Sequence, residues 1–403
     1  MRHGRWLAAV ALFSISCAGN PSRLHTFKLV DDPTAIVVWG LVFAHPTERV
    51  KLLTPLLEPI EALGGVGLDS KDKVLFTANF QGVYSAVRVR DQETLWRHSG
   101  VDPLSMPPTF VSKESVRSPD DLVIFGSQNG RVFAVNAQTG ATVWTYEMGG
   151  EISEAPTVAE GRLLIMNSRN QLMALDALTG KWLWQYTRDF PVGLTILGHS
   201  GVAVKADKVF VGFSDGFLAC VQLDDGLLQW SRPLTLSGQG FADADATPIV
   251  VGDRVYASSV HDGVYALKAD TGDVIWQLRA ANVTRLTAQD PTLFALSASG
   301  KLQAIDADSG KPRWELKFPT AVVSKPVAHR GYIAFGAKPG GLYVVDVQTG
   351  RLVQRFFPGG VASELAVRGG SLAFMSEGSV IYYMRYGEKH NLLLDAKRRY
   401  VGL

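Results

Sequence analysis

The feature of this sequence that most constrains its fold is a short motif that returns along most of the chain. Its clearest copy reads QLMALDALTGKWLW, at residues 171–184. Side chains alternate along a strand, which would place Leu172 on one face and Met173 on the other. Gly180 predicts a tight turn, because glycine tolerates a positive φ, and Trp184 then falls on a second strand. The motif is therefore predicted to be a β-hairpin, which is marginal alone and needs neighbours.

The motif recurs with a regular period. Five copies carry both the turn glycine and the tryptophan, at 132–144, 171–184, 217–230, 264–276 and 302–314. Two degenerate copies flank them, 83–96 with Gln92 at the glycine position and 342–354 with Gln354 at the tryptophan position. The tryptophan position recurs every 38 to 48 residues, with a mean of 43. That period suits a four-stranded propeller blade.

Six tryptophans hold the same place in the repeat. They are Trp96, Trp144, Trp184, Trp230, Trp276 and Trp314. A large aromatic side chain on an outer strand can fill the wedge-shaped gap between neighbouring blades and bury roughly 200 Å². We therefore interpret these tryptophans as structural residues and not as evidence of a cofactor.

Each period also contains an upstream half that predicts two further short strands around a glycine turn, as at 152–170. A β-sandwich shares the short strands and glycine turns. A fixed period with one tryptophan per unit favours radial repetition instead. The predicted fold class is all-β, an eight-bladed β-propeller of four-stranded antiparallel blades.

The two ends of the repeat region are predicted to form one blade together. Residues 361–386 supply three strand patterns and no fourth. Residues 36–44 read IVVWGLVFA, in which Trp39 and the apolar residues after it resemble an outer strand with its tryptophan. Pairing of these two segments would close the ring and remove its open edges. The propeller would then span 36–386, interrupted by an irregular connector at 45–63.

The N-terminal segment has the layout of a bacterial lipoprotein signal. Residues 1–16 combine a basic start, an apolar run and small residues, which is typical of a signal peptide and too short for a stable membrane span. Cys17 follows in the sequence SISC, which resembles a lipobox except that Ser14 stands where leucine is usual. By the same resemblance, a lipidated Cys17 followed by Ala18 implies the outer membrane, facing the periplasm. Residues 17–35 would be a tether, and ordinary secretion without a lipid is the alternative.

Composition excludes several classes of function. The 403 residues carry a net charge of +2, so the chain lacks the basic field that nucleic-acid binding requires. It has no disulfide framework, and Cys220 in an apolar strand is expected to be a buried, inert thiol. Paired Cys/His spacings, GxSxG, P-loop and HExxH motifs are missing from the sequence. We expect no enzyme chemistry, metal or cofactor, and we interpret 387–403 as a charged tail after the propeller.

Two stretches depart from the repeat. Residues 190–200 read FPVGLTILGHS, with apolar Leu194 and Ile196 where a loop should lead into a strand. Residues 238–248 read GQGFADADATP, and Asp243 and Asp245 within them share one face if the segment is extended. The structural alternatives are core packing for the apolar pair and turn capping for the acidic pair.

These details resemble a known family. Repeats of the form AxDxxTGxxxW are those of the pyrroloquinoline-quinone-like β-propellers. Within that group, LTILGHS before the fourth blade, DADATPIVVGDRVYA at the start of the fifth and the missing tryptophan at 354 resemble the BamB family of outer-membrane assembly lipoproteins. The resemblance implies a non-enzymatic eight-bladed scaffold without a cofactor. It would act as a monomer within a complex, dock on the periplasmic domains of BamA and support the insertion of β-barrel proteins.

The resemblance also implies a partner-binding site. The family binds its partner through two leucines and an arginine in one loop and two aspartates in the next. The local match places Leu194 and Ile196 on the leucines, and Asp243 and Asp245 on the aspartates. Leu197 stands where the arginine would be, and leucine cannot make the bidentate contacts of a guanidinium.

Two other interpretations stay open at this point. One is a propeller lipoprotein of similar shape that binds a different periplasmic protein. The other is a quinoprotein dehydrogenase, whose relatives are longer and carry a vicinal cysteine pair and calcium-binding carboxylates. The two cysteines of this chain, Cys17 and Cys220, are far apart in the sequence.

Overall fold

The architecture is described by a computed structural model. It describes the backbone of 39–46 and, with their side chains, nearly all residues of 65–69, 71, 73–100, 102–104, 106–188, 200–234, 243–244, 246–280, 282–319, 321–322, 324–338, 340–356, 361, 363–376 and 380–386. The predicted signal peptide, Cys17, the tether, most of the connector and the tail lie outside these residues.

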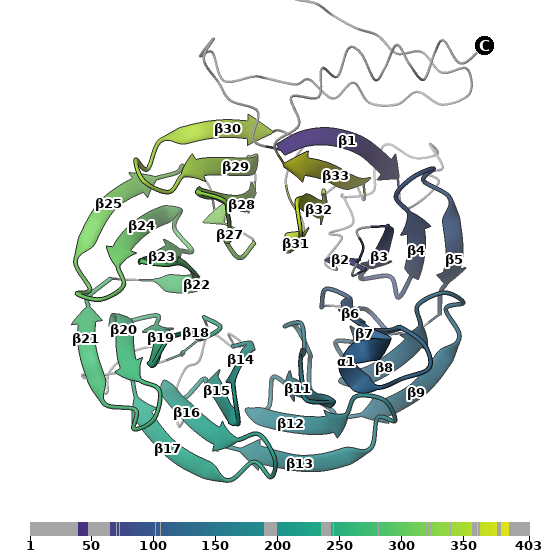
Figure 1. Ribbon diagram of the computed structural model, residues 1–403, viewed down its shortest axis with the longest axis horizontal. Helices are drawn as coiled ribbons and strands as arrows, with labels where there is room; N and C mark the ends of the chain where they lie inside the picture. The colour runs from purple at the N-terminus through teal and green to yellow at the C-terminus, as the bar shows by residue number, and fades with distance from the viewer. Residues whose placement is uncertain are drawn as a thin grey trace, which may run out of the picture.

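Eight antiparallel sheets form a ring of blades around a central channel (Figure 1). The strands of each blade are named from the channel outwards. Blade 1 contains β2 (Gly65–Leu68), β3 (Val74–Ala78), β4 (Tyr84–Arg88) and β5 (Thr94–His98), and blade 2 contains β6 (Thr109–Val111), β7 (Leu122–Gly126), β8 (Arg131–Asn136) and β9 (Thr142–Glu147). Blade 3 contains β10 (Thr157–Ala159), β11 (Arg162–Met166), β12 (Gln171–Asp176) and β13 (Trp182–Thr187), and blade 4 contains β14 (Val202–Lys205), β15 (Lys208–Gly212), β16 (Phe217–Gln222) and β17 (Leu228–Pro233).

The second half of the ring repeats this arrangement. Blade 5 contains β18 (Ile249–Val251), β19 (Arg254–Ser259), β20 (Gly263–Lys268) and β21 (Val274–Leu278), and blade 6 contains β22 (Val283–Gln289), β23 (Thr292–Ser297), β24 (Lys301–Asp306) and β25 (Pro312–Lys317). Blade 7 contains β26 (Ala321–Val322) and β27 (Val327–His329) beside β28 (Tyr332–Lys338), followed by β29 (Gly341–Asp346) and β30 (Leu352–Phe356). Blade 8 contains β31 (Ala366–Arg368), β32 (Ser371–Met375), β33 (Val380–Tyr386) and β1 (Trp39–Pro46). The predicted eight-bladed propeller is confirmed.

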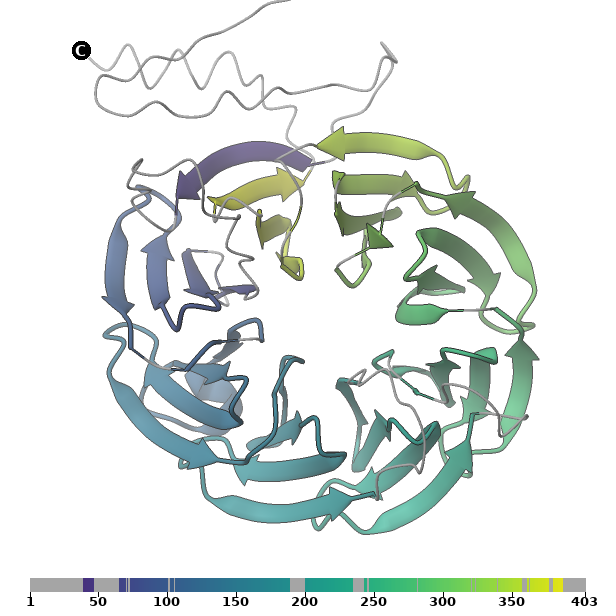
Figure 2. The ribbon, with the colours of Figure 1, turned by 180° about the vertical axis from the view of Figure 1, so that it is seen from behind.

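The chain order gives the ring two distinct faces. Successive strands of a blade are antiparallel, so the turns between first and second strands and between third and fourth strands lie on one face, which we call the turn face. The turns between second and third strands, and the connections from one blade to the next, lie on the opposite face, which we call the connection face. Figure 2 shows the ring from behind.

The core lies between the blades. Within the described residues, eight apolar clusters each contain side chains of two neighbouring blades. The two faces of β12 show the principle, because Leu172 packs toward blade 4 and Met173 packs toward blade 2. Alternation along a strand therefore serves two interfaces at once, as the sequence predicted.

Each of the six blade tryptophans packs on the turn glycine of the following blade. A Cβ on Gly180, whose φ is +69°, would lie 2.5 Å from a ring carbon of Trp144. The indole N–H of Trp144 donates a hydrogen bond of 3.2 Å to the carbonyl of Ala177. The same two contacts join Trp96, Trp184, Trp230, Trp276 and Trp314 to the turns of Gly140, Gly226, Gly272, Gly310 and Gly350, with hydrogen bonds of 2.9 to 3.0 Å. Each of these six tryptophans thus contacts the neighbouring blade through its ring and its indole N–H.

Blade 8 closes the ring with strands from both ends of the chain. β1 pairs antiparallel with β33, and the order of the sheet is β1-β33-β32-β31. In the blades with a tryptophan, that residue is the first paired residue after a bulge in the outer strand, as where Trp184 pairs with Ala174 and the residue before it is bulged. The closure confirms the predicted pairing of the two ends, and the bulge identifies the tryptophan position in each blade.

The prediction that Trp39 takes the blade-tryptophan position is wrong. The bulge of β1 lies between Leu41 and Phe43, and Phe43 pairs with Tyr383 at the tryptophan position. Trp39, which precedes Phe43 by four residues, pairs with Tyr386 instead. The bulge inserts one extra residue into β1, and an alternating pattern of apolar residues does not reveal where a bulge lies, so the sequence pattern could not fix the register. β1 also extends to Pro46, into the segment predicted as a connector.

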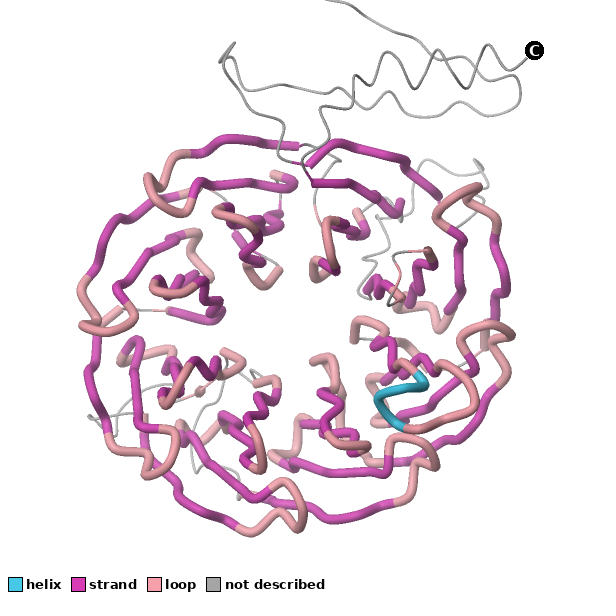
Figure 3. Tube along the Cα trace, viewed as in Figure 1, coloured by secondary structure: helices cyan, strands magenta, loops and turns pink. Residues whose placement is uncertain are grey.

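Two small elements depart from the four-strand plan. A single turn of helix, α1 (Lys113–Val116), lies between β6 and β7 (Figure 3). The Ser112 hydroxyl caps it by accepting from the Ser115 amide. In blade 7, β28 is long enough to pair with both β26 and β27.

Candidate partner-binding surface

Both stretches that depart from the repeat join one blade to the next. The first leads from β13 to β14, and the second leads from β17 to β18. They follow each other around the ring, so their ends lie side by side on the connection face. Leu194, Ile196, Leu197 and Asp245 lie outside the described residues. The structure therefore describes where these connections begin and end.

Asp243 is the one predicted partner-binding residue that the structure describes, and its side chain is fully buried. Its carbonyl accepts a hydrogen bond of 3.1 Å from the amide of Val260 in the same blade. The expectation that Asp243 presents its carboxylate at the surface is therefore not met, because the side chain is enclosed by the protein itself.

The first connection begins at Arg188, which is held against blade 4. Its Nε donates to a carboxylate oxygen of Asp215 at 2.7 Å, and the two side chains are 20% and 15% exposed. The guanidinium also lies 4.2 Å from the ring centroid of Phe217 and donates to the Ser231 hydroxyl at 3.2 Å. A charged hydrogen bond combined with stacking on an aromatic ring fixes the direction in which the chain leaves β13.

The far ends of the two connections are hydrogen-bonded to each other. The Ser200 hydroxyl lies 3.3 Å from the carbonyl of Ala246, and the amide of Gly201 donates to the Thr247 hydroxyl at 3.1 Å. A Cβ on Gly201 would lie 2.5 Å from that hydroxyl, so only glycine permits this approach. The start of β14 is thereby held against the residues that precede β18.

The ring encloses a channel with a cavity of about 670 Å³. It is lined by the first strands of seven blades and the residues just before them. Much of the wall is apolar, including Val66, Leu68, Phe110 and Leu286. Charged side chains gather where the first strands begin, which is the connection-face end of the channel.

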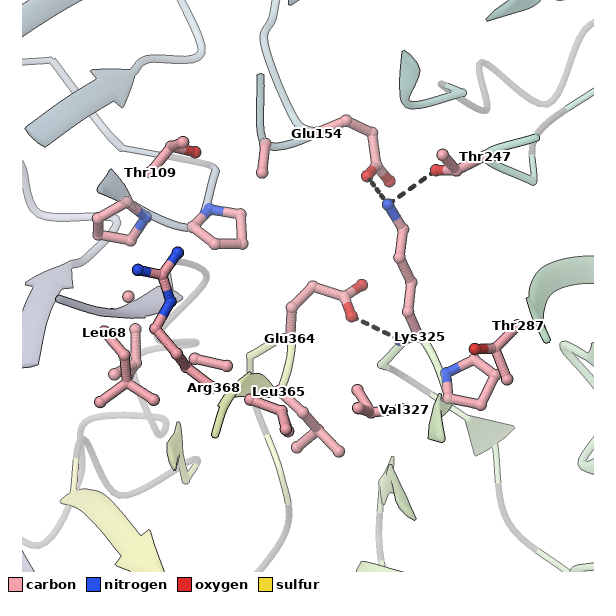
Figure 4. A pocket seen from close by; sticks show the side chains of 18 of the residues that line it. Leu68, Thr109, Glu154, Thr247, Thr287, Lys325, Val327, Glu364, Leu365 and Arg368 are labelled. Carbon is pink, nitrogen blue, oxygen red and sulfur yellow. Dashed lines mark hydrogen bonds and ion pairs between the residues drawn. The ribbon is translucent and has the colours of Figure 1, made fainter. Parts of the chain in front are cut away.

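Lys325 is the centre of this charged cluster (Figure 4). Its ammonium forms an ion pair with Glu154 and donates to the Thr247 hydroxyl at 2.9 Å. Its backbone amide donates to the carboxylate of Glu364. The Glu364 carboxylate also lies 3.8 Å from the Nε of Arg285. Burial in the channel raises the pKa of Glu364, while Lys325 and Arg285 oppose that rise.

Other chemistry can be assessed over the described residues. They contain no group of three or more His, Cys, Asp or Glu side chains that could hold a metal ion. Cys220 is buried as predicted, and burial raises the pKa of its thiol to about 12, so it stays protonated and unreactive at neutral pH. Among the helices of this part of the chain, none is long and apolar enough to cross a membrane.

The sequence of the repeat region matches one known family. A family model described as outer membrane protein assembly factor BamB matches residues 79–315 and 260–389, which together cover more than half of the chain. The chain belongs to this family. Its members are assembly factors and not enzymes, so the interpretation as a quinoprotein dehydrogenase is set aside.

Individual relatives agree with this assignment. The chain is similar to BamB of Shewanella oneidensis, with 29% identity over 239 residues, 58% of this chain and 60% of that protein. It is 25% identical to BamB of Yersinia pestis over 323 residues, 76% of this chain and 81% of that one. The crystal structure of BamB from Moraxella catarrhalis superposes with a TM-score of 0.73 at 21% identity, covering 87% of this chain and all of that structure. The likeness to the crystal structure supports the fold.

Sequence reasoning missed the charged cluster in the channel. Its members come from blades 3, 5, 6, 7 and 8, and Lys325 and Glu154 are 171 residues apart. One pattern could have pointed to it. Thr247 and Lys325 each immediately precede the proline that leads into an inner strand, so the ring brings both residues to the same end of the channel.

Proposed function

We propose that this protein is a periplasm-facing scaffold of the machinery that inserts β-barrel proteins into the outer membrane. The observation that carries the proposal is the match of the BamB family model across the propeller. Relatives of the chain are outer membrane protein assembly factors.

The proposed partner is a BamA-like protein, bound at the connection face through Leu194, Ile196 and Asp245, with Leu197 beside them. Apolar side chains flanked by a carboxylate form a typical binding hot spot, because the aliphatic groups lose their water and the charge selects the partner. Support comes from the shared attachment of the two connections through Ser200, Gly201 and Thr247. Buried Asp243 would support the shape of the second connection.

The proposed location is the periplasmic face of the outer membrane, with a lipid on Cys17. A single acyl chain binds a membrane reversibly, whereas several chains anchor a protein stably. Replacement of Cys17 by serine should therefore move the protein from the membrane fraction to the soluble periplasm. A wild-type protein that already fractionates as soluble would contradict the anchor.

The partner surface is tested by Leu194→Ala combined with Ile196→Ala, with capture of the periplasmic domains of a BamA-like protein as the measurement. We expect at least a thirtyfold loss of affinity, or about 2 kcal/mol, with an unchanged melting temperature. The matched control is Leu227→Ala with Leu228→Ala. These leucines are 63% and 48% exposed at a third-to-fourth-strand turn of blade 4, on the turn face.

Unchanged capture by the folded loop variant would show that this surface is the wrong one. Unfolding of the loop variant would support core packing by Leu194 and Ile196. Asp215 is unsuitable as a control residue, because it holds Arg188 at the start of the first connection. A wild-type protein that captures a different periplasmic protein and not a BamA-like one would favour the alternative partner.

A further inference from the structure

Lys325 joins parts of the ring that lie on different sides of the channel. The residue comes from blade 7, just before β27, whereas Glu154 comes from blade 3 and Thr247 from blade 5. Blades 3 and 7 are separated by three blades in either direction around the ring. Figure 4 shows the lysine side chain reaching across the channel toward both partners.

This arrangement differs from a surface ion pair. The Glu154 side chain is 11% exposed and that of Lys325 is 30% exposed, so both groups have given up much of their water. Extending a lysine across a channel also costs side-chain entropy. Removing the ammonium would leave a largely buried carboxylate without its cation, which a protein tolerates poorly. The extended position of the Lys325 side chain is therefore held by its contacts with Glu154 and Thr247.

The Thr247 hydroxyl links this lysine to the candidate surface. It accepts from the Lys325 ammonium at 2.9 Å and from the Gly201 amide at 3.1 Å. A hydroxyl oxygen has two lone pairs, so these two donors saturate it as an acceptor. Gly201 lies at the end of the first connection, and Thr247 lies near the end of the second. A single oxygen atom thus joins the ends of both connections to a cation from the far side of the ring.

We propose that Lys325 is a positioning residue for partner binding, which sets the relative placement of the β14 and β18 ends of the two connections by acting through Thr247. This inference rests on the proposed function, since it assigns the lysine a role at the same connection face. Lys325 itself lies inside the channel and does not contact the partner. Its effect on affinity comes from holding Thr247, and through it Gly201, in one arrangement.

The test compares Lys325→Met with wild type in the full chain. Methionine retains an unbranched apolar side chain and removes the ammonium. We expect about tenfold weaker capture of the periplasmic domains of a BamA-like protein. We also expect faster hydrogen exchange at the Gly201 amide, measured without partner. Lys325→Arg, which keeps a charged donor, should recover most of the affinity.

A matched control and a second variant keep the test decisive. Lys208 forms an ion pair with Asp270 between blades 4 and 5 on the turn face, so Lys208→Met should leave both capture and Gly201 exchange unchanged. Thr247→Val removes the shared acceptor and should weaken capture to a similar extent. Combining it with Lys325→Met should add little, because both changes break the same path. If Lys325→Met does not fold, the capture affinity and the Gly201 amide exchange of Thr247→Val provide the test instead. Weaker capture with faster exchange would support the positioning role, and no change in either would contradict it.

The two hypotheses fail in different ways. Normal capture by Lys325→Met and Thr247→Val, together with loss of capture in the Leu194→Ala, Ile196→Ala variant, would overturn the positioning role and keep the proposed surface. Unchanged capture by all of these variants would overturn the surface itself. A lower melting temperature of Lys325→Met with unchanged affinity and Gly201 exchange would show that the lysine only stabilises the ring, which also overturns the proposal.

Discussion

Two interfaces of the ring, between blades 3 and 4 and between blades 7 and 8, both bury an apolar cluster. They differ in whether a tryptophan contacts the turn of the following blade. Between blades 3 and 4, Trp184 packs on Gly226 and donates to the carbonyl of Leu223 at 2.9 Å. Blade 7 carries Gln354 at the tryptophan position. Blade 8 has no hairpin between its third and fourth strands, because β33 and β1 come from opposite ends of the chain.

Among the residues that the structure describes, the interface between blades 7 and 8 has no tryptophan contact of this kind but contains other aromatic contacts. The Tyr386 ring lies 4.9 Å from the ring of His329, measured between centroids, and the guanidinium of Arg330 lies 5.3 Å from it. The cluster between these blades includes Phe356, Phe374 and Tyr382 side chains. In this comparison the tryptophan contact occurs where the following blade has a turn to receive it, and the interface without such a turn has an apolar core with aromatic contacts.

The largest effect should come from opening the ring. Deletion of residues 18–46 removes β1 and leaves the β33 edge unpaired. We expect the purified protein to aggregate or to lose its cooperative unfolding transition, because an open strand edge pairs with other chains. Size-exclusion chromatography and circular dichroism provide the measurement. A monomer with the wild-type melting temperature would show that β1 is dispensable for closure.

A strong effect is expected at a glycine under a tryptophan. Gly180→Ala combines a strained positive φ with a Cβ 2.5 Å from Trp144, and should lower the free energy of unfolding by about 2–4 kcal/mol. Gly161→Ala is the matched control, since Gly161 has a φ of +76° and nothing within 4 Å of the added Cβ. It should cost about 1 kcal/mol. Equal urea midpoints for the two variants would mean that the tryptophan contact does not constrain the turn.

An intermediate effect should follow from changing the tryptophans themselves. Trp184→Phe loses the indole hydrogen bond and part of the buried ring, and should cost about 1–3 kcal/mol in urea unfolding. The reciprocal variant Gln354→Trp should bring no gain in stability, because blade 8 offers no hairpin turn to receive the indole. A clear stabilisation by Gln354→Trp would show that the turn is not required.

The smallest effect should come from ion pairs between blades. The hydrogen bond from Lys208 lowers the pKa of Asp270, so the pair stabilises the fold above the unfolded pKa of about 3.9 and is lost as the pH falls through the folded pKa. Because Asp270 is exposed, Asp270→Asn should shift the melting temperature by less than about 2 °C at pH 7. At pH 2 the variant and the wild type should melt alike. A difference that persists at pH 2 would assign Asp270 another role.

The sequence by itself determined the repeat, the blade, the six structural tryptophans and the pairing of the chain ends, and its motifs led to the family. These are local or periodic properties. A hairpin is encoded by neighbouring residues, and a repeated hairpin can bury its two faces only against copies of itself. Only the tertiary structure decided the register of β1, where Phe43 and not Trp39 takes the tryptophan position, since that register depends on a bulge between Leu41 and Phe43 that the alternating pattern does not reveal. It alone showed that Asp243 is buried, because burial depends on what covers a residue and not on its own type. The contact of Lys325 with Glu154 and Thr247 likewise needs the closed ring, which brings residues from three blades to one point in the channel.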